Sequence, residues 1–163
     1  MAFDNLKREL QIYGRLYSDR LKQKLREDDN YATGRLDKSI KPTQVNIVGE
    51  DVEISLMADK YIGAISEGRR AGRIPPSTSI LEWAKAKGIK PLKGGDSPSN
   101  MKRMSFAIAR SIGVHGMLKD YGFKGTGIID FVYKSLSDKM GEDLFNAYKK
   151  DIEEQLKKQV KTN

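Results

Sequence analysis

Several stretches of the chain show the apolar spacing that is typical of amphipathic helices. Over residues 3–28 an apolar side chain recurs every three or four positions, which places these side chains on one face of a single long helix. Shorter patterns of the same kind predict helices over residues 77–87, 100–112, 128–140 and 142–160. The apolar face of the first helix consists of Phe3, Leu6, Leu10, Tyr13, Leu16, Tyr17, Leu21 and Leu25.

The segment 44–57 alternates apolar and polar residues on both sides of a glycine-containing turn at residues 48–51, which predicts an antiparallel β-hairpin. Two strands are marginally stable alone, so we expect a third strand, either from residues 36–40 or from a neighbouring subunit. The predicted fold class is α+β: mostly helical, with long N- and C-terminal helices packed on a small antiparallel β-sheet. The alternating apolar residues are Val45, Ile47, Val52, Ile54 and Leu56.

A length of 163 residues fits a single domain. We divide residues 1–163 into an N-terminal helix (1–28), a core that contains the hairpin and a basic middle (29–124), and C-terminal helices (125–163). Residues 67–73, Glu-Gly-Arg-Arg-Ala-Gly-Arg, predict an exposed, flexible, basic loop.

A second predicted loop, residues 91–100, is rich in Gly, Ser and Pro and precedes the helix over 100–112. In the helix over 77–87, Ser79 and Glu82 have the spacing of a capping box, with Ser77 as a competing cap, and Gly88 is expected to end the helix. We expect Trp83, on the apolar face of this helix, to be a core residue.

The composition of the chain excludes several kinds of site and several classes of protein. Hydrophobic residues make up 38% of the chain and charged residues 32%, so we expect a modest core under a highly charged surface. The absence of cysteine excludes disulfides and thiolate zinc sites, and a single histidine, His115, excludes a multi-histidine metal site. No apolar run approaches the roughly 20 residues that span a bilayer, and the first ten residues lack the apolar stretch of a signal peptide. We therefore expect neither a membrane protein nor an exported one.

The net charge of +8 lies in the middle of the chain. Residues 59–124 carry 13 basic and 5 acidic side chains, whereas the other residues together carry equal numbers of each. Such a block produces a local positive field that attracts polyanions or an acidic protein surface. A solvated surface that only keeps the protein soluble is the other interpretation, and charge alone does not separate the two.

No motif supports an enzyme. The glycines of residues 122–127 do not have the order of a phosphate-binding loop, and no dinucleotide-binding fingerprint follows a predicted strand. Glu50, Asp51 and Glu53 lie in the hairpin turn or on its polar face, so they do not converge as nuclease carboxylates would. We predict no catalytic residue, no metal ligand and no cofactor.

The basic middle could contact nucleic acid through phosphates, in a salt-dependent way. Two aromatic residues, Tyr61 and Trp83, are too few for a base-stacking platform. The connection over residues 88–99 is also too long for a helix-turn-helix. Sequence-specific recognition is therefore not expected. The basic residues that could contact phosphates are Lys85, Lys87, Lys90, Lys93, Lys102, Arg103 and Arg110.

Short motifs over residues 31–116 occur together in an order that resembles one family. They are Thr33-Gly34-Arg35-Leu36 with Ser39-Ile40, Tyr61-Ile62, Glu67-Gly68-Arg69-Arg70, Ile74-Pro75-Pro76, Ile80-Leu81-Glu82-Trp83-Ala84-Lys85-Ala86-Lys87-Gly88-Ile89, Phe106-Ala107-Ile108-Ala109-Arg110-Ser111-Ile112, and Gly116. This arrangement resembles the tail-completion, or tail-to-head joining, family of neck proteins in tailed bacteriophages. The sequence departs from that pattern at Ile62, Ala64 and Ile65, where members often have Ala and Val, and at Gly68-Arg69-Arg70, which replaces a more usual Gly-Thr.

The resemblance implies a structural virion protein: an oligomeric connector ring at the neck, around the DNA channel, that joins head and tail. Its partners would be further copies of itself, other neck, portal-side or tail proteins, and packaged DNA by electrostatic contact, with no membrane. Its location would be the virion, and the host cytoplasm during assembly. The C-terminal 40 residues exceed what a typical member needs, so the protein could instead sit at another level of the neck or at the tail hub.

A basic accessory protein that binds nucleic acid without sequence specificity is the alternative function. For the virion subunit we expect the basic loop over residues 67–73 to meet a partner or DNA, and the loop over residues 91–100 to become ordered on assembly. The candidate partner- or DNA-facing residues are Arg69, Arg70, Arg73, Lys90, Lys93, Lys102 and Arg103.

Overall fold

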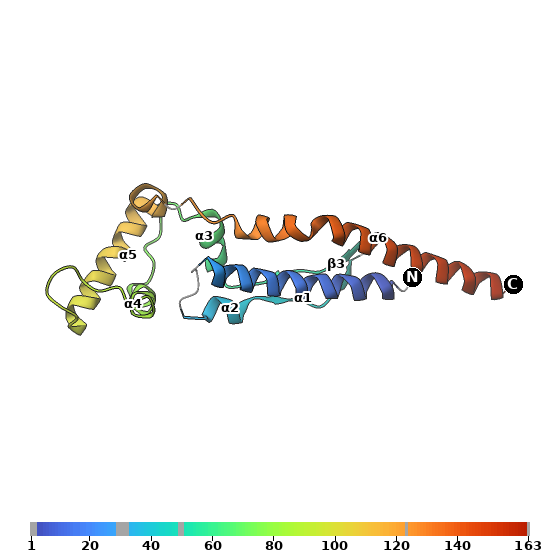
Figure 1. Cartoon of the computed structure of the whole chain (residues 1–163), viewed down its shortest axis with the longest axis horizontal. Helices are drawn as coiled ribbons and strands as arrows, with labels where there is room; N and C mark the ends of the chain where they lie inside the picture. Colours follow the sequence, from blue (N-terminus) through green and yellow to red (C-terminus); the bar gives the residue numbers. More distant parts are fainter. Residues whose placement is uncertain (1–2, 29–32, 49–50, 123, 163) are drawn as a thin grey trace. The chain divides into compact units, whose positions relative to one another are not determined.

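The structure is a computed structural model that describes residues 3–28, 33–48, 51–122 and 124–162. The chain forms two compact units (Figure 1). Residues 1–24, 38–59 and 128–163 make up the first, which we call the helix-pair unit, and residues 25–37 and 60–127 make up the second, which we call the basic unit. The chain passes from one unit to the other four times, so neither unit is a contiguous segment.

Two long helices form the frame of the helix-pair unit. Helices α1 (Asp4–Glu27) and α6 (Ile128–Thr162) lie side by side and run antiparallel (Figure 1). The N-terminal end of α1 meets Asp151 of α6, and its middle meets Asp143. This agrees with the predicted long terminal helices. The buried apolar residues of the unit are Tyr13, Leu21, Ile40, Ile128, Val132 and Ala147.

The prediction of two separate C-terminal helices, over 128–140 and 142–160, is wrong because α6 continues through Gly141. No heavy atom outside the local helix backbone lies within 4 Å of the position that a Cβ at Gly141 would occupy. One glycine in a helix costs only about 1 kcal/mol relative to alanine, which 35 residues of helix can absorb.

The predicted hairpin is confirmed and begins earlier than expected. Strand β2 (Asn46–Val48) pairs antiparallel with β3 (Asp51–Glu53), with Ile47 opposite Val52. Strand β1 (Lys41–Pro42) pairs with β4 (Leu56–Met57), so one hairpin carries two short ladders. It lies against α1, where a side chain at Gly14 would collide with Ile54.

Residues 36–40 do not supply the expected third strand. Helix α2 (Arg35–Ser39) occupies this segment instead. Its sequence, Arg-Leu-Asp-Lys-Ser, contains no β-branched or aromatic residue and includes good helix formers, so local propensity favours the helix.

The basic unit consists mainly of α3 (Tyr61–Glu67), α4 (Ser77–Ala86) and α5 (Pro98–Tyr121), with α4 packed on α5. Helix α4 begins directly after Pro76 without a side-chain cap, so the predicted capping box of Ser79 and Glu82 is wrong; both residues already lie inside the helix. Gly88 ends α4, as predicted, and the amide of Ile89 donates to the carbonyl of Ala84. The buried apolar residues of the unit are Leu25, Ile65, Ala84, Met101, Ala109 and Ile112.

Trp83 of α4 is only partly buried, so its prediction as a core residue is confirmed in part. Helix α5 is longer than the predicted 100–112 at both ends. Its N-terminal end is capped by the Ser97 side chain, which accepts a hydrogen bond from the amide of Asn100. Gly113 remains helical, whereas Gly116, with φ 73° and ψ −170°, breaks the helical geometry.

Candidate functional site

The Arg-rich segment 68–74, which we call the arginine loop, lies directly on helix α5. The amide of Gly72 donates to the carbonyl of Gly113 (2.8 Å), and the amide of Met117 donates to the carbonyl of Arg69 (2.8 Å). The second bond exists because the backbone break at Gly116 turns the amide of Met117 away from the helix ladder. The arginine loop is therefore anchored to α5 by two backbone hydrogen bonds, and most of its residues are exposed, as predicted.

Two glycines of α5 allow this close approach. A Cβ at Gly116 would lie 2.6 Å from the carbonyl oxygen of Arg69 and 2.7 Å from the amide nitrogen of Ala71. A Cβ at Gly113 would lie 2.5 Å from Cγ1 of Ile74 and 3.0 Å from its Cα. At Gly116 backbone therefore packs on backbone, at Gly113 the backbone of α5 packs on Ile74, and only glycine leaves room for either contact.

Within the arginine loop the three arginines are not equivalent. Arg69 is half-buried, and its guanidinium donates to the carbonyl of Arg73 at 2.6 Å. Arg70 and the side chain of Arg73 are exposed. The structure therefore gives Arg69 a role in closing the loop and leaves Arg70 and Arg73 as the cations that point to solvent.

The segment before the arginine loop is fixed as well. The amides of Thr126 and Gly127 donate to the carbonyls of Ile65 and Ser66, at 2.9 and 2.8 Å, and so satisfy carbonyls at the C-terminal end of α3. Gly125 packs against the backbone of residues 66–68. Residues 65–72 are therefore held between the 125–127 segment and α5.

Lys90 and Lys93 lie on the loop between α4 and α5. Lys90 forms an ion pair with Asp96 (2.5 Å), and the hydrogen bond and negative charge of Asp96 raise the pKa of Lys90. The side-chain amide of Asn100 donates to the carbonyl of Gly94 across the same loop. The loop thus has internal ties, and Lys93 remains exposed on it.

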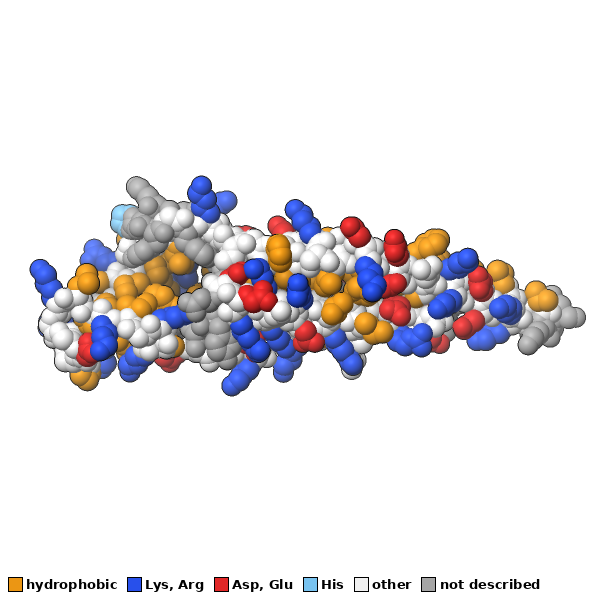
Figure 2. All heavy atoms as spheres, viewed as in Figure 1, with side chains coloured by type: hydrophobic (Ala, Val, Ile, Leu, Met, Phe, Trp, Pro, Cys, Tyr) orange, Lys and Arg blue, Asp and Glu red, His pale blue; other side chains and the backbone are white. Residues whose placement is uncertain are grey.

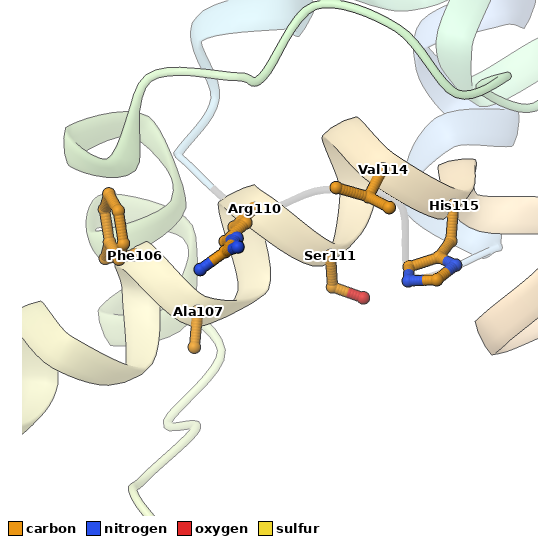
Figure 3. Close-up of a pocket in the computed structure, with 6 residues that line it drawn as sticks. All are labelled: Phe106, Ala107, Arg110, Ser111, Val114 and His115. Atoms are coloured by element: carbon orange, nitrogen blue, oxygen red, sulfur yellow. The ribbon is translucent and has the colours of Figure 1, made fainter.

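Lys102 and Arg103 lie near the start of α5, both exposed. Further along, the exposed side of α5 carries apolar side chains together with Arg110, on the opposite side from the buried Met101, Ser105 and Ala109. An open hollow of about 400 Å³ lies over this side, and Figure 3 shows its six side chains projecting from successive turns of α5. They are Phe106, Ala107, Arg110, Ser111, Val114 and His115.

Phe106 and Val114 are 59% and 56% exposed, and the sequence analysis did not select them as surface residues. The helical period of the sequence predicts their exposure, because both residues lie about half a turn away from the apolar face that Met101 and Ile112 define. Among the described residues, no acidic side chain lines the hollow.

All seven candidate cations belong to the basic unit. By sequence this unit contains 15 basic and 8 acidic residues, against 15 and 14 in the helix-pair unit. On the visible face over α4 and α5, basic side chains outnumber acidic ones (Figure 2). The excess charge that the sequence placed over 59–124 is therefore concentrated in one folded unit.

Within the described part of the chain, no group of three or more potential metal-ligating side chains is found. In the same residues, no helix combines the length and the apolar character needed to cross a membrane. No family model, curated protein or solved structure matches this chain.

Proposed function

We propose that this protein is a non-enzymatic structural subunit of a tailed-phage virion, a neck or tail-completion protein that forms a ring between head and tail. The observation that carries the proposal is the ordered set of motifs over residues 31–116, which resembles that family. The protein would associate with further copies of itself and with neighbouring neck, portal-side or tail proteins.

Two motif glycines have backbone conformations that favour glycine, which supports treating the motifs as structural. Gly68 ends α3 with φ 78°, a conformation that favours glycine. Pro75 is buried beside the start of α4, and Gly116 admits the arginine loop. The motifs thus maintain one framework, α3 through α5, that presents exposed cations.

Within this proposal, the exposed cations of the basic unit face packaged DNA or an acidic neighbouring subunit. These cations are Arg70, Arg73, Lys93, Lys102 and Arg103. Arg69 and Lys90 contribute less, because the first closes the arginine loop and the second is paired with Asp96.

Disruption of the gene in the phage that encodes it tests the proposal. We expect electron microscopy of the lysate to show filled heads separated from finished tails, or tails with abnormal ends. Restoring the gene from a plasmid should restore joined particles and serves as the control. Intact, DNA-filled, tailed particles from the disrupted phage would contradict the proposed function.

The alternative is a nucleic-acid-binding accessory protein outside the virion, and the charge of the basic unit is the observation that favours it. It predicts that the free protein binds duplex DNA at low salt, with an affinity that falls steeply and linearly on a log–log plot as salt rises. Fluorescence anisotropy with two unrelated duplexes measures this, and negligible binding at low salt would eliminate the alternative.

A further inference from the structure

We propose that the exposed face of α5 in one copy of this protein binds the exposed face of α6 in a second copy. The first face, which we call the α5 row, consists of Arg103, Phe106, Arg110 and Val114. The second, which we call the α6 row, consists of Phe131, Asp138, Glu142 and Phe145.

The α5 row is a mixed basic and apolar surface. Its members are three or four residues apart, so they lie along one side of the helix. All four are exposed, and two of them are large apolar side chains. Figure 3 shows Phe106, Arg110 and Val114 on successive turns beside the hollow.

The α6 row has the opposite charge and similar apolar content. Spacings of seven, four and three residues place its members on one side of α6, away from the buried Val132 and Ala147 that pack in the helix-pair unit. Phe131 and Phe145 are 53% and 67% exposed, although the ammonium of Lys24 lies 5.2 Å from the ring centre of Phe131. Asp138 and Glu142 are exposed between them.

The two rows are complementary in charge. At 1.5 Å of rise per residue, the two arginines of the α5 row lie about 10 Å apart along the axis and the two carboxylates of the α6 row about 6 Å. The long arginine side chains can span that difference. Among the described residues, none of these four charged side chains takes part in an ion pair within the chain.

Charge also determines which of the two rows can pair with each other. Two α5 rows would bring arginines together, and two α6 rows would bring carboxylates together, so like-with-like pairing is disfavoured. The α5 row of one copy therefore meets the α6 row of another. One such contact between each pair of copies builds a ring or a filament, whereas two reciprocal contacts close a two-fold dimer. This inference rests on the proposed function only in that a ring subunit must bind itself head to tail.

The exposed apolar side chains favour a protein over DNA at the α5 row. A phosphate backbone would engage Arg103 and Arg110 but would leave Phe106 and Val114 in water. A second chain that brings Phe131 or Phe145 to the same place buries apolar surface on both chains. Charge and apolar content together thus point to the α6 row as the occupant.

Paired charge reversals test the inference with the full chain. We expect wild type, 18.4 kDa as a monomer, to show a mass that rises with concentration in sedimentation equilibrium and light scattering. The variants Arg103→Glu/Arg110→Glu and Asp138→Lys/Glu142→Lys should each stay monomeric at the same concentrations. An equimolar mixture of the two should regain association, because each variant then meets a row of opposite charge on the other.

Lys85→Glu/Lys93→Glu is the matched control for the arginine variant, since it makes the same change in net charge on exposed residues of the basic unit. It should associate as wild type does, and circular dichroism melts should show that all variants remain folded. A wild-type chain that is monomeric at every concentration, or folded variants whose mixture fails to associate, would overturn the inference. The two proposals can also be told apart. If the variants lose association but the gene-disrupted phage still gives normal particles, the proposed interface is supported and the proposed role in the virion is contradicted.

Discussion

Gly116→Ala should destabilise the basic unit by about 3 kcal/mol. The backbone at Gly116 has φ 73° and ψ −170°, a region that residues with a side chain occupy at a cost of about 1–3 kcal/mol. The added methyl group would also lie 2.6 Å from the carbonyl oxygen of Arg69, an atom of the backbone that cannot rotate away. The free energy of unfolding, measured by urea denaturation with circular dichroism, checks this value.

Substitutions at two other glycines separate the two causes of this loss of stability, the backbone strain and the collision with the arginine loop. Gly88→Ala, at φ 65° with open space around the new methyl group, should cost only about 1 kcal/mol for the left-handed backbone. Gly141→Ala, inside α6 with no neighbour within 4 Å, should stabilise by about 0.5–1 kcal/mol. If Gly116→Ala lowers the free energy of unfolding no more than Gly88→Ala does, the close contact between the arginine loop and α5 is contradicted.

Asp151→Ala should cost about 3 kcal/mol of stability in the helix-pair unit. The buried carboxylate of Asp151 accepts hydrogen bonds from the backbone amides of Asn5 (3.0 Å) and Leu6 (2.9 Å) and from the side-chain amide of Asn5 (2.9 Å). It therefore caps the N-terminal end of α1 from a position in α6 more than 140 residues later in the sequence. Removing it leaves these donors without their acceptor, and an unsatisfied buried donor costs about 1–3 kcal/mol.

The pH dependence of stability should reveal the same carboxylate. Burial alone would raise the pKa of Asp151, but the hydrogen bonds from Leu6 and Asn5 outweigh it and lower that pKa. A lowered pKa in the folded state means that the stabilisation is complete above the unfolded value of about 4 and is lost as the pH falls through the folded value. The stability difference between wild type and Asp151→Asn should therefore be largest at neutral pH and shrink below about pH 4.

Urea midpoints of the two proteins at pH 7, 4 and 3 measure this effect. Glu153→Gln is the matched control, because Glu153 is an exposed acid of the same helix with only a 3.9 Å ion pair to Lys149. Exposed pairs contribute about 0–1 kcal/mol, so this variant should follow the wild-type pH profile. A difference between wild type and Asp151→Asn that stays constant with pH would mean that the charge of Asp151 does not stabilise α1.

The candidate site was predictable in its residue types and only partly in its geometry. Charge counting along the sequence found the segment that became the basic unit, because net charge needs no knowledge of contacts. Charge counting could not distinguish Arg69 from Arg70, although of these two only Arg70 is exposed. The helical period places Phe106 away from the buried face of α5. Only the fold shows that nothing in the described structure covers it.

By itself the sequence determined the elements whose pattern is local. The period of apolar residues specified α1, the alternation around a turn specified the hairpin, and Gly88 specified the end of α4, since each depends on neighbours within a few residues. Contacts between distant segments were decided by the tertiary structure alone. The arginine loop is anchored through backbone atoms to Gly113 and to Met117, more than 40 residues later, and backbone groups are the same in every residue. They leave no periodic signal in a sequence, so the anchoring of the arginine loop and the division into interleaved units became visible only in the folded chain.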